Sequence, residues 1–299
     1  MKFRLLILSF LTMFCESVFS QPQTLNMAFE QQAVRQFGAD NPFTVAINPG
    51  HHATGPTGSL RNYSGDEPQS PNGTTQKLRA TTGTTFHSSA TPVPAVHPEG
   101  TRNESDANFY IGKRMKERLE AAGVRVIFTD TSYPNLVSNI ERAEAGNKAD
   151  LSVSIHFMGA GDKGAFAMLL DPQSYTSKDG WITSGDRLRY DGHDAPPPCG
   201  RTWTERYKWI YDESMKVARI LERLMMSDYI DGVQPNSSGF IRYFTNITGL
   251  NWTTVPTLYM EGGYVGNPTE GPWIANNLDL IADTYVKAIL EYAETRTKD

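Results

Sequence analysis

The sequence predicts an α/β fold: a single domain with a mostly parallel, twisted sheet flanked by helices and interrupted by two long loop insertions. Short apolar runs typical of buried strands alternate with longer segments of helical periodicity. No internal repeat or separate linker divides the chain. Hydrophobic residues make up 39% of the 299 residues, which is enough apolar material for one substantial core. We therefore expect one domain built on a central sheet.

The first 20 residues have the features of a secretory signal peptide. Lys2 and Arg4 precede an apolar run over residues 5–14, and small residues before Gln21 offer a cleavage site. The run is too short for a stable membrane anchor, so we expect an exported protein, periplasmic or secreted, that is not anchored after cleavage. Removal of residues 1–20 leaves Cys199 as the one thiol, so no internal disulfide is expected.

Charge excludes one class of partner. The chain has 28 Lys and Arg against 33 Asp and Glu, a formal net charge of -5. Binding to the phosphate backbone of nucleic acids needs a basic surface, and no excess of basic residues supplies one. We therefore expect no nucleic-acid partner.

The first predicted strand follows a short N-terminal segment, residues 21–42. Residues 44–47 form an apolar run that Asn48, Pro49 and Gly50 close as a turn. Residues 53–103 are rich in Gly, Thr, Ser and Pro and show no period of 2 or 3.6, so we interpret them as the first insertion. A helix is predicted over 105–122, because its apolar residues fall on one face and Gly123 suits the position after its end.

The middle of the chain alternates between strands and helices. Residues 124–128 predict a strand, and the more polar segment 136–149 predicts a second helix. Two further strands are expected over 151–155, which ends at His156, and over 165–170. This alternation is the pattern of parallel strands joined by helical crossovers.

Turn-forming residues dominate 171–201 and predict the second insertion. A long amphipathic helix follows over 203–228. The chain then closes with a strand over 257–260, which leads to Glu261, and a helix over 273–295. These elements complete the predicted domain, residues 43–299.

Polar residues follow three of the predicted strands. His51, His156 and Glu261 each lie at such an end, and Glu104 opens the helix after the first insertion. In open α/β sheets, ligands bind at the carboxyl ends of the strands. Two histidines and a carboxylate form a catalytic zinc site when a fourth position is left to water, and a further carboxylate can act as the base.

Each member of this set also has a purely structural interpretation. The two histidines can equally be turn or hydrogen-bonded residues, and Glu104 can be a first-turn carboxylate favoured by the helix dipole. Glu261 is harder to explain structurally, because it follows the apolar residues of a buried strand and a buried carboxylate needs a partner.

Four segments together resemble the zinc-dependent N-acetylmuramoyl-L-alanine amidases. They are Asn48-Pro49-Gly50-His51, Glu104-Ser105-Asp106-Ala107-Asn108, residues 149–156 ending in His156, and Glu261-Gly262-Gly263-Tyr264 with Asn267-Pro268-Thr269-Glu270. The family has DPGH, a helix opened by ExDxN, a strand reading ADLFISIH and a late ExGFxSNxxE, in the same order. The resemblance covers roughly residues 43–295.

This resemblance implies a metal-dependent amide hydrolase. His51, Glu104 and His156 would bind Zn2+, and Glu261 would be the catalytic carboxylate. The implied substrate is the amide between the lactyl group of N-acetylmuramic acid and L-alanine in peptidoglycan, which places the protein in a bacterial cell envelope. A hydrolase of another amide and a non-catalytic cell-wall-binding relative are the alternative functions. A protein activator is a further possible partner.

The sequence departs from the family pattern at several positions. Asn48 replaces an aspartate, and His51 and Glu104 are 53 positions apart, more than the usual family spacing. That spacing leaves Glu67 and Glu99 as competing ligands, although neither has the helix-opening context of Glu104. Whether any other histidine contacts substrate or metal stays open; these are His52, His87, His97 and His193. Arg142 fits either the family pattern or a helix surface.

Overall fold

The structure is a computed structural model that describes residues 42–51, 84–93, 103–129, 139–159, 161–170, 203–229, 232–244, 247–251 and 253–296. Its strands are β1 (Thr44–Pro49), β2 (Arg125–Phe128), β3 (Leu151–Met158), β4 (Phe166–Leu170), β5 (Ile241–Phe244) and β6 (Thr257–Tyr264). Its helices are α2 (Glu104–Ala121), α3 (Asn139–Gly146), α5 (Trp203–Asp228), α6 (Thr248–Asn251), α7 (Glu270–Asn276) and α8 (Leu278–Thr295).

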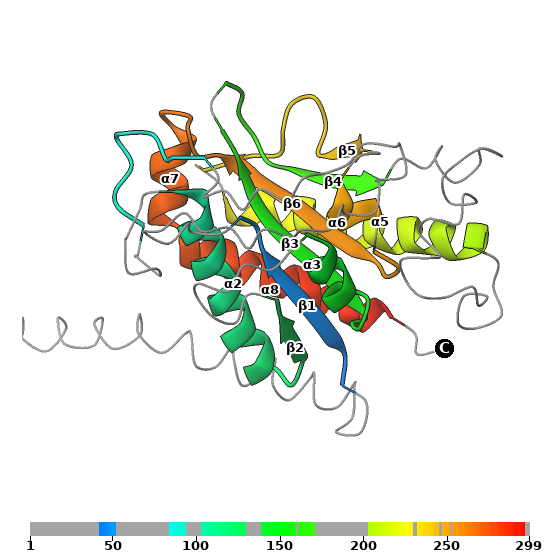
Figure 1. Cartoon of the computed structure of the whole chain (residues 1–299). Helices are drawn as coiled ribbons and strands as arrows, with labels where there is room; N and C mark the ends of the chain where they lie inside the picture. Colours follow the sequence, from blue (N-terminus) through cyan, green and yellow to red (C-terminus); the bar gives the residue numbers. More distant parts are fainter. Residues whose placement is uncertain are drawn as a thin grey trace, which may run out of the picture.

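The described strands form one sheet in the order β2-β1-β3-β6-β4-β5 (Figure 1). Strands β2, β1, β3 and β6 are parallel, and β4 and β5 are parallel to each other. The junction between β6 and β4 is antiparallel. The predicted class is therefore confirmed: the sheet is mostly parallel and helices flank it. The carboxyl ends of β1, β3 and β6 meet at one edge.

Helices cover both faces of the sheet (Figure 1). On one face α2, α5 and α8 pack against the strands and against one another, and they bury side chains such as Ile47, Val153 and Leu258 in a large apolar core. The strands in this layer read as nearly continuous apolar runs because the sheet is also covered on its other face, by α3 and α6. On that face Phe166 and Met168 form a second, smaller cluster with Leu250.

Several predicted boundaries change in the structure. The closing helix predicted over 273–295 is wrong as one element: it starts earlier, at Glu270, and breaks into α7 and α8 at Asn277, which leaves the helical conformation. The Asn277 side-chain amide donates to the Trp273 carbonyl at 2.7 Å and stabilises this break. Strands β3 and β6 extend three and four residues beyond their predicted ends, which places His156 and Glu261 inside strands.

Part of the first insertion packs into the core. Residues 84–93 are described, and Phe86, Ala90 and Val93 are buried. Thr85 pairs with Asn103 in an antiparallel bridge, which brings this segment to the start of α2. The predicted signal peptide and the second insertion, 171–201, lie outside the described residues. Among the helices that are described, none is both long and apolar enough to cross a membrane.

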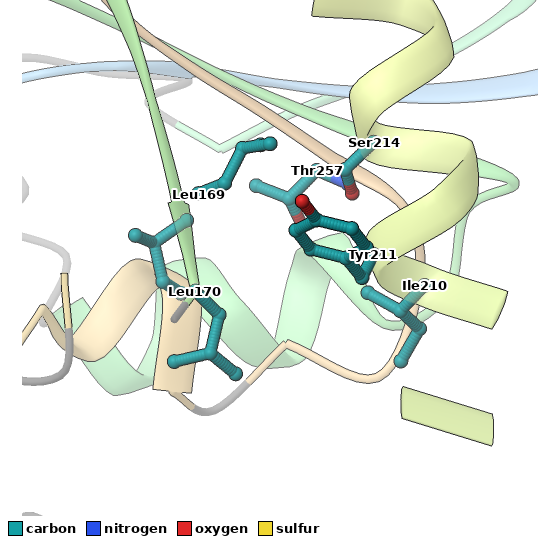
Figure 2. Close-up of a pocket in the computed structure, with 7 residues that line it drawn as sticks. Leu169, Leu170, Ile210, Tyr211, Ser214 and Thr257 are labelled. Atoms are coloured by element: carbon teal, nitrogen blue, oxygen red, sulfur yellow. The ribbon is translucent and has the colours of Figure 1, made fainter. Parts of the chain in front are cut away.

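A small pocket lies between α5 and the sheet, beside Thr257 at the start of β6 (Figure 2). The Ser214 hydroxyl in this pocket accepts a hydrogen bond from the Thr257 backbone amide at 2.8 Å. Its lining residues are Leu169, Leu170, Ile210, Tyr211, Ser214, Leu250 and Thr257. Thr257 is the first residue of β6, whereas Glu261 lies four residues further along the strand. The pocket is therefore separate from the polar residues at the carboxyl ends of the strands.

Candidate metal centre

The first turn of α2 places Glu104 at the carboxyl edge of the sheet. Asn103 caps the helix, and its side-chain oxygen accepts a hydrogen bond from the Asp106 amide at 3.2 Å. Glu104 is 2% exposed, and its carboxylate accepts hydrogen bonds from the backbone amides of Phe157 at 3.0 Å and Thr84 at 3.1 Å. These bonds fix the carboxylate between the end of β3 and the described segment 84–93 of the insertion.

His51 follows β1 in an unusual backbone conformation. Its φ of 60° lies in the left-handed region, which costs a residue other than glycine about 1 kcal/mol or more. The neighbouring Gly50 continues the β1–β3 pairing, because its amide donates to the Ile155 carbonyl at 2.8 Å. Asn108 of α2 donates to the Gly50 carbonyl at 3.0 Å. The turn is therefore fixed from both β3 and α2.

Arg142 of α3 contacts the same turn through its guanidinium group. It is buried in α3, and its guanidinium donates to the Asn48 side chain and to the carbonyls of Pro49 and His51. Of the two interpretations that the sequence left open, the helix-surface one is wrong, because the side chain points inward. Its three acceptors lie on the segment that presents His51, so Arg142 offsets the cost of the left-handed conformation.

The His51, Glu104 and His156 side chains converge at the sheet edge. One Glu104 oxygen lies 3.2 Å from His51 Nε2 and 3.4 Å from His156 Nδ1. One ligand atom from each of the three lies within 4.8 Å of the others, so the group could hold a metal ion. Tyr259 Oη lies 2.9 Å from His156 Nε2, which leaves Nδ1 as the nitrogen that faces the other two side chains. A contact of this kind orients a metal-binding histidine.

Burial and charge set the protonation of this cluster. Burial alone would raise the pKa of Glu104, but its contacts with His156 and His51 outweigh burial and hold that pKa well below the ordinary value. Burial lowers the pKa of His156, and Glu104 offsets this only in part. An ionised carboxylate beside a neutral imidazole is the protonation state in which these side chains bind a metal.

Glu261 lies beside this cluster. Its Cα pairs with that of His156 across β6 and β3, so both side chains project from the same face of the sheet. Glu261 is 6% exposed, and its Oε2 atom is buried without a hydrogen-bond partner among the described residues. Burial, and secondarily the nearby Glu104, raises the pKa of Glu261 well above the ordinary value.

This arrangement fits a catalytic zinc ion. A His2Glu donor set with one open position is a known form of such sites, and a buried carboxylate oxygen without a partner suits a base beside the ion. Of the sequence candidates, the structure brings together His51, Glu104, His156 and Glu261. His87 is half-buried and its ring contacts the Ser89 hydroxyl instead. Glu67, Glu99, His52, His97 and His193 lie outside the described residues.

Sequence reasoning missed two contributors, Thr84 and Tyr259. Thr84 lies in a segment without periodicity, so no local signal indicated that its amide would contact Glu104. Tyr259 did carry a signal: it precedes Glu261 by two positions in a strand, and such residues share a face.

Comparison with known proteins identifies the family. The sequence profile of the N-acetylmuramoyl-L-alanine amidases matches residues 45–291. The chain belongs to this amidase family. It is therefore an amidase of a family that acts on the cell wall. The comparison with curated proteins found no match to the sequence of this chain.

Solved structures of amidases share the fold. The N-acetylmuramyl-L-alanine amidase of Mycobacterium smegmatis superimposes with a TM-score of 0.59 at 18% identity, over 85% of this chain and 98% of that chain. The Mycobacterium abscessus amidase, in its apo form, gives 0.58 at 18% identity, over 84% and 98%. The catalytic domain of the N-acetylmuramoyl-L-alanine amidase from Bacillus (Paenibacillus) polymyxa gives a TM-score of 0.52 at 15% identity, over 85% of this chain and 99% of that chain.

The role of Arg142 in the amidase predicts a change in metal affinity. Arg142→Gln removes donors from the turn that presents His51, so we expect metal affinity to fall about 10- to 100-fold, measured with Zn2+ as the probe in competition with a chromophoric chelator. Arg142→Lys keeps the charge but cannot reach three acceptors at once, and it should lose nearly as much. An exposed control, Arg219→Gln, should keep the metal affinity of the unchanged protein. Unchanged affinity in a folded Arg142→Gln protein would contradict the positioning role.

Proposed function

We propose that the protein is a zinc-dependent enzyme that cleaves the amide between the lactyl group of N-acetylmuramic acid and L-alanine in peptidoglycan. The observation that supports this most directly is the convergence of His51, Glu104 and His156 beside Glu261 at one edge of the sheet. The family match supports the cell wall as the place of action. Residues 1–20 would direct export to the bacterial periplasm or the medium.

In this proposal His51, Glu104 and His156 hold the zinc ion. The bound ion would supply Lewis-acid polarisation of the scissile carbonyl and a lower pKa for the attacking water. Glu261 accepts the proton of that water and returns it to the leaving amine. Burial suits this role, because a raised carboxyl pKa favours both taking up the proton and giving it back near neutral pH.

The test is digestion of purified peptidoglycan by the protein without residues 1–20, followed by mass spectrometry. With zinc present, we expect peptides that begin with L-alanine and glycan strands that lack peptides. A chelator should abolish both products, and added zinc should restore them. Zinc-loaded protein that releases neither product would contradict the proposal and favour another amide substrate or a need for an activator. Cleavage that survives complete metal removal would exclude the zinc mechanism.

A further inference from the structure

A row of side chains extends across the sheet from the candidate metal centre. His156 of β3 pairs with Glu261 of β6, and Glu261 pairs with Phe166 of β4. Paired residues project from the same face, and adjacent strands lie about 4.8 Å apart. The row therefore leads from the metal centre, past Glu261, to Phe166.

A cation from the neighbouring row of the same face covers the far end of this row. Arg242 of β5 pairs with Met168, which in turn pairs with Tyr259, so Arg242 shares the face of Glu261. Its guanidinium carbon lies 3.9 Å from the centre of the Phe166 ring. Stacking on an aromatic ring fixes a guanidinium in place and leaves its edge free to donate hydrogen bonds. Figure 1 shows β6, β4 and β5 side by side in this part of the sheet.

The positive charge of Arg242 is only weakly compensated by neighbouring carboxylates. The one carboxylate that pairs with it among the described residues belongs to Asp162, at 4.0 Å, and the Asp162 side chain is 57% exposed. Such an exposed and distant pair contributes little binding energy. Arg242 itself is only 28% exposed, so water solvates it incompletely. Arg242 also donates a side-chain hydrogen bond to Tyr264, and Tyr264 lies within electrostatic range of Glu261, which connects the cation to the reaction site.

A guanidinium has five N–H donors, so Arg242 keeps donors beyond its contacts with Tyr264 and Asp162. Such a planar cation recognises carboxylates through paired hydrogen bonds. On the two sides of the scissile amide, the sugar side offers hydroxyl and acetamido groups, whereas carboxylates lie on the peptide side. We propose that Arg242 is a specificity residue that binds a carboxylate of the peptide beyond L-alanine, and so sets the direction in which substrate lies along the row. This inference rests on the proposed function and adds the substrate class that the site prefers.

The test uses two N-acetylmuramoyl-L-alanyl-glutamate substrates, one with free carboxylates and one with both converted to primary amides. Arg242→Met keeps an apolar stem on Phe166 and removes the donors. Wild-type protein should favour the free acid. The variant should lose roughly 10- to 100-fold in kcat/KM for the free acid, mainly through KM, and stay within about twofold for the diamide. Arg219→Met, on the exposed surface of α5, is the matched control and should behave as wild type.

Equal losses on both substrates, or no loss on either, would overturn the role of Arg242. Failure of wild-type protein to cleave either substrate, with zinc bound, would count against the proposed function instead. Calorimetric titration with the free peptide L-alanyl-glutamate and its diamide then decides the carboxylate preference without turnover. Tighter binding of the acid that Arg242→Met removes would support the inference, and equal binding of the two peptides would refute it.

Discussion

Replacing Glu261 by glutamine is expected to lower kcat about 1,000-fold while zinc remains bound. Glutamine has nearly the same shape but cannot accept the proton of the attacking water, and loss of a positioned general base costs between about 100- and 10,000-fold. Glu261 is not in the group that could hold the metal, so zinc content measured by elemental analysis should match wild type. Hydrolysis of peptidoglycan, followed by mass spectrometry, gives the rate.

The same variant should be more stable than wild type when the protein is metal-free. Burial raises the folded-state pKa of Glu261, so its contribution to the free energy of unfolding is fully present below the unfolded pKa, about 4.3, and is lost as pH rises through the raised value. Glutamine carries no charge at any pH and removes this loss. The melting temperature at pH 7 should therefore rise in Glu261→Gln and not in the exposed control Glu120→Gln. Full activity of the variant would exclude Glu261 as the base.

Replacing Gly50 by alanine is expected to weaken metal binding severely. A Cβ atom there would lie 2.2 to 2.4 Å from three atoms of the His156 ring, far inside contact distance. Either the imidazole turns away from Glu104 or the end of β1 separates from β3. We expect zinc affinity to fall by at least about 100-fold, since a ligand is displaced rather than merely loosened, and stability to fall by about 1–3 kcal/mol through overpacking.

Gly159 provides a matched control for this substitution. A Cβ at Gly159 would meet the nearest atom, Thr84 Oγ1, at 3.4 Å, so Gly159→Ala should bind zinc normally. Combining Gly50→Ala with His156→Ala should recover stability in the metal-free protein, because the clash disappears, while zinc binding stays weak. Calorimetry of zinc binding and thermal denaturation measure both effects. Normal zinc affinity in Gly50→Ala would show that His156 is not held where the structure places it.

Local sequence patterns determined most of the elements. The amphipathic period over 203–228 predicted α5 with its observed bounds, and apolar runs located the buried strands β1, β3 and β6. Strand β5 was missed because it is short and only partly buried, so it has neither a continuous apolar run nor a clear alternation. Pattern alone also could not show that β4 runs antiparallel to β6, because side chains alternate between the two faces in the same way in both directions.

The sequence by itself supplied the chemistry of the site: two histidines and two carboxylates, at predicted strand ends and at a helix start. Only the tertiary structure decided which groups meet. Glu104 lies 53 positions from His51, and it reaches both histidines because Asn103 starts α2 beside the ends of β1 and β3. Arg142 was ambiguous for the same reason, since a short polar helix does not show which side it buries. Residue types set what a side chain can bind, whereas convergence across the sheet depends on strand pairing and helix packing between residues far apart in the chain.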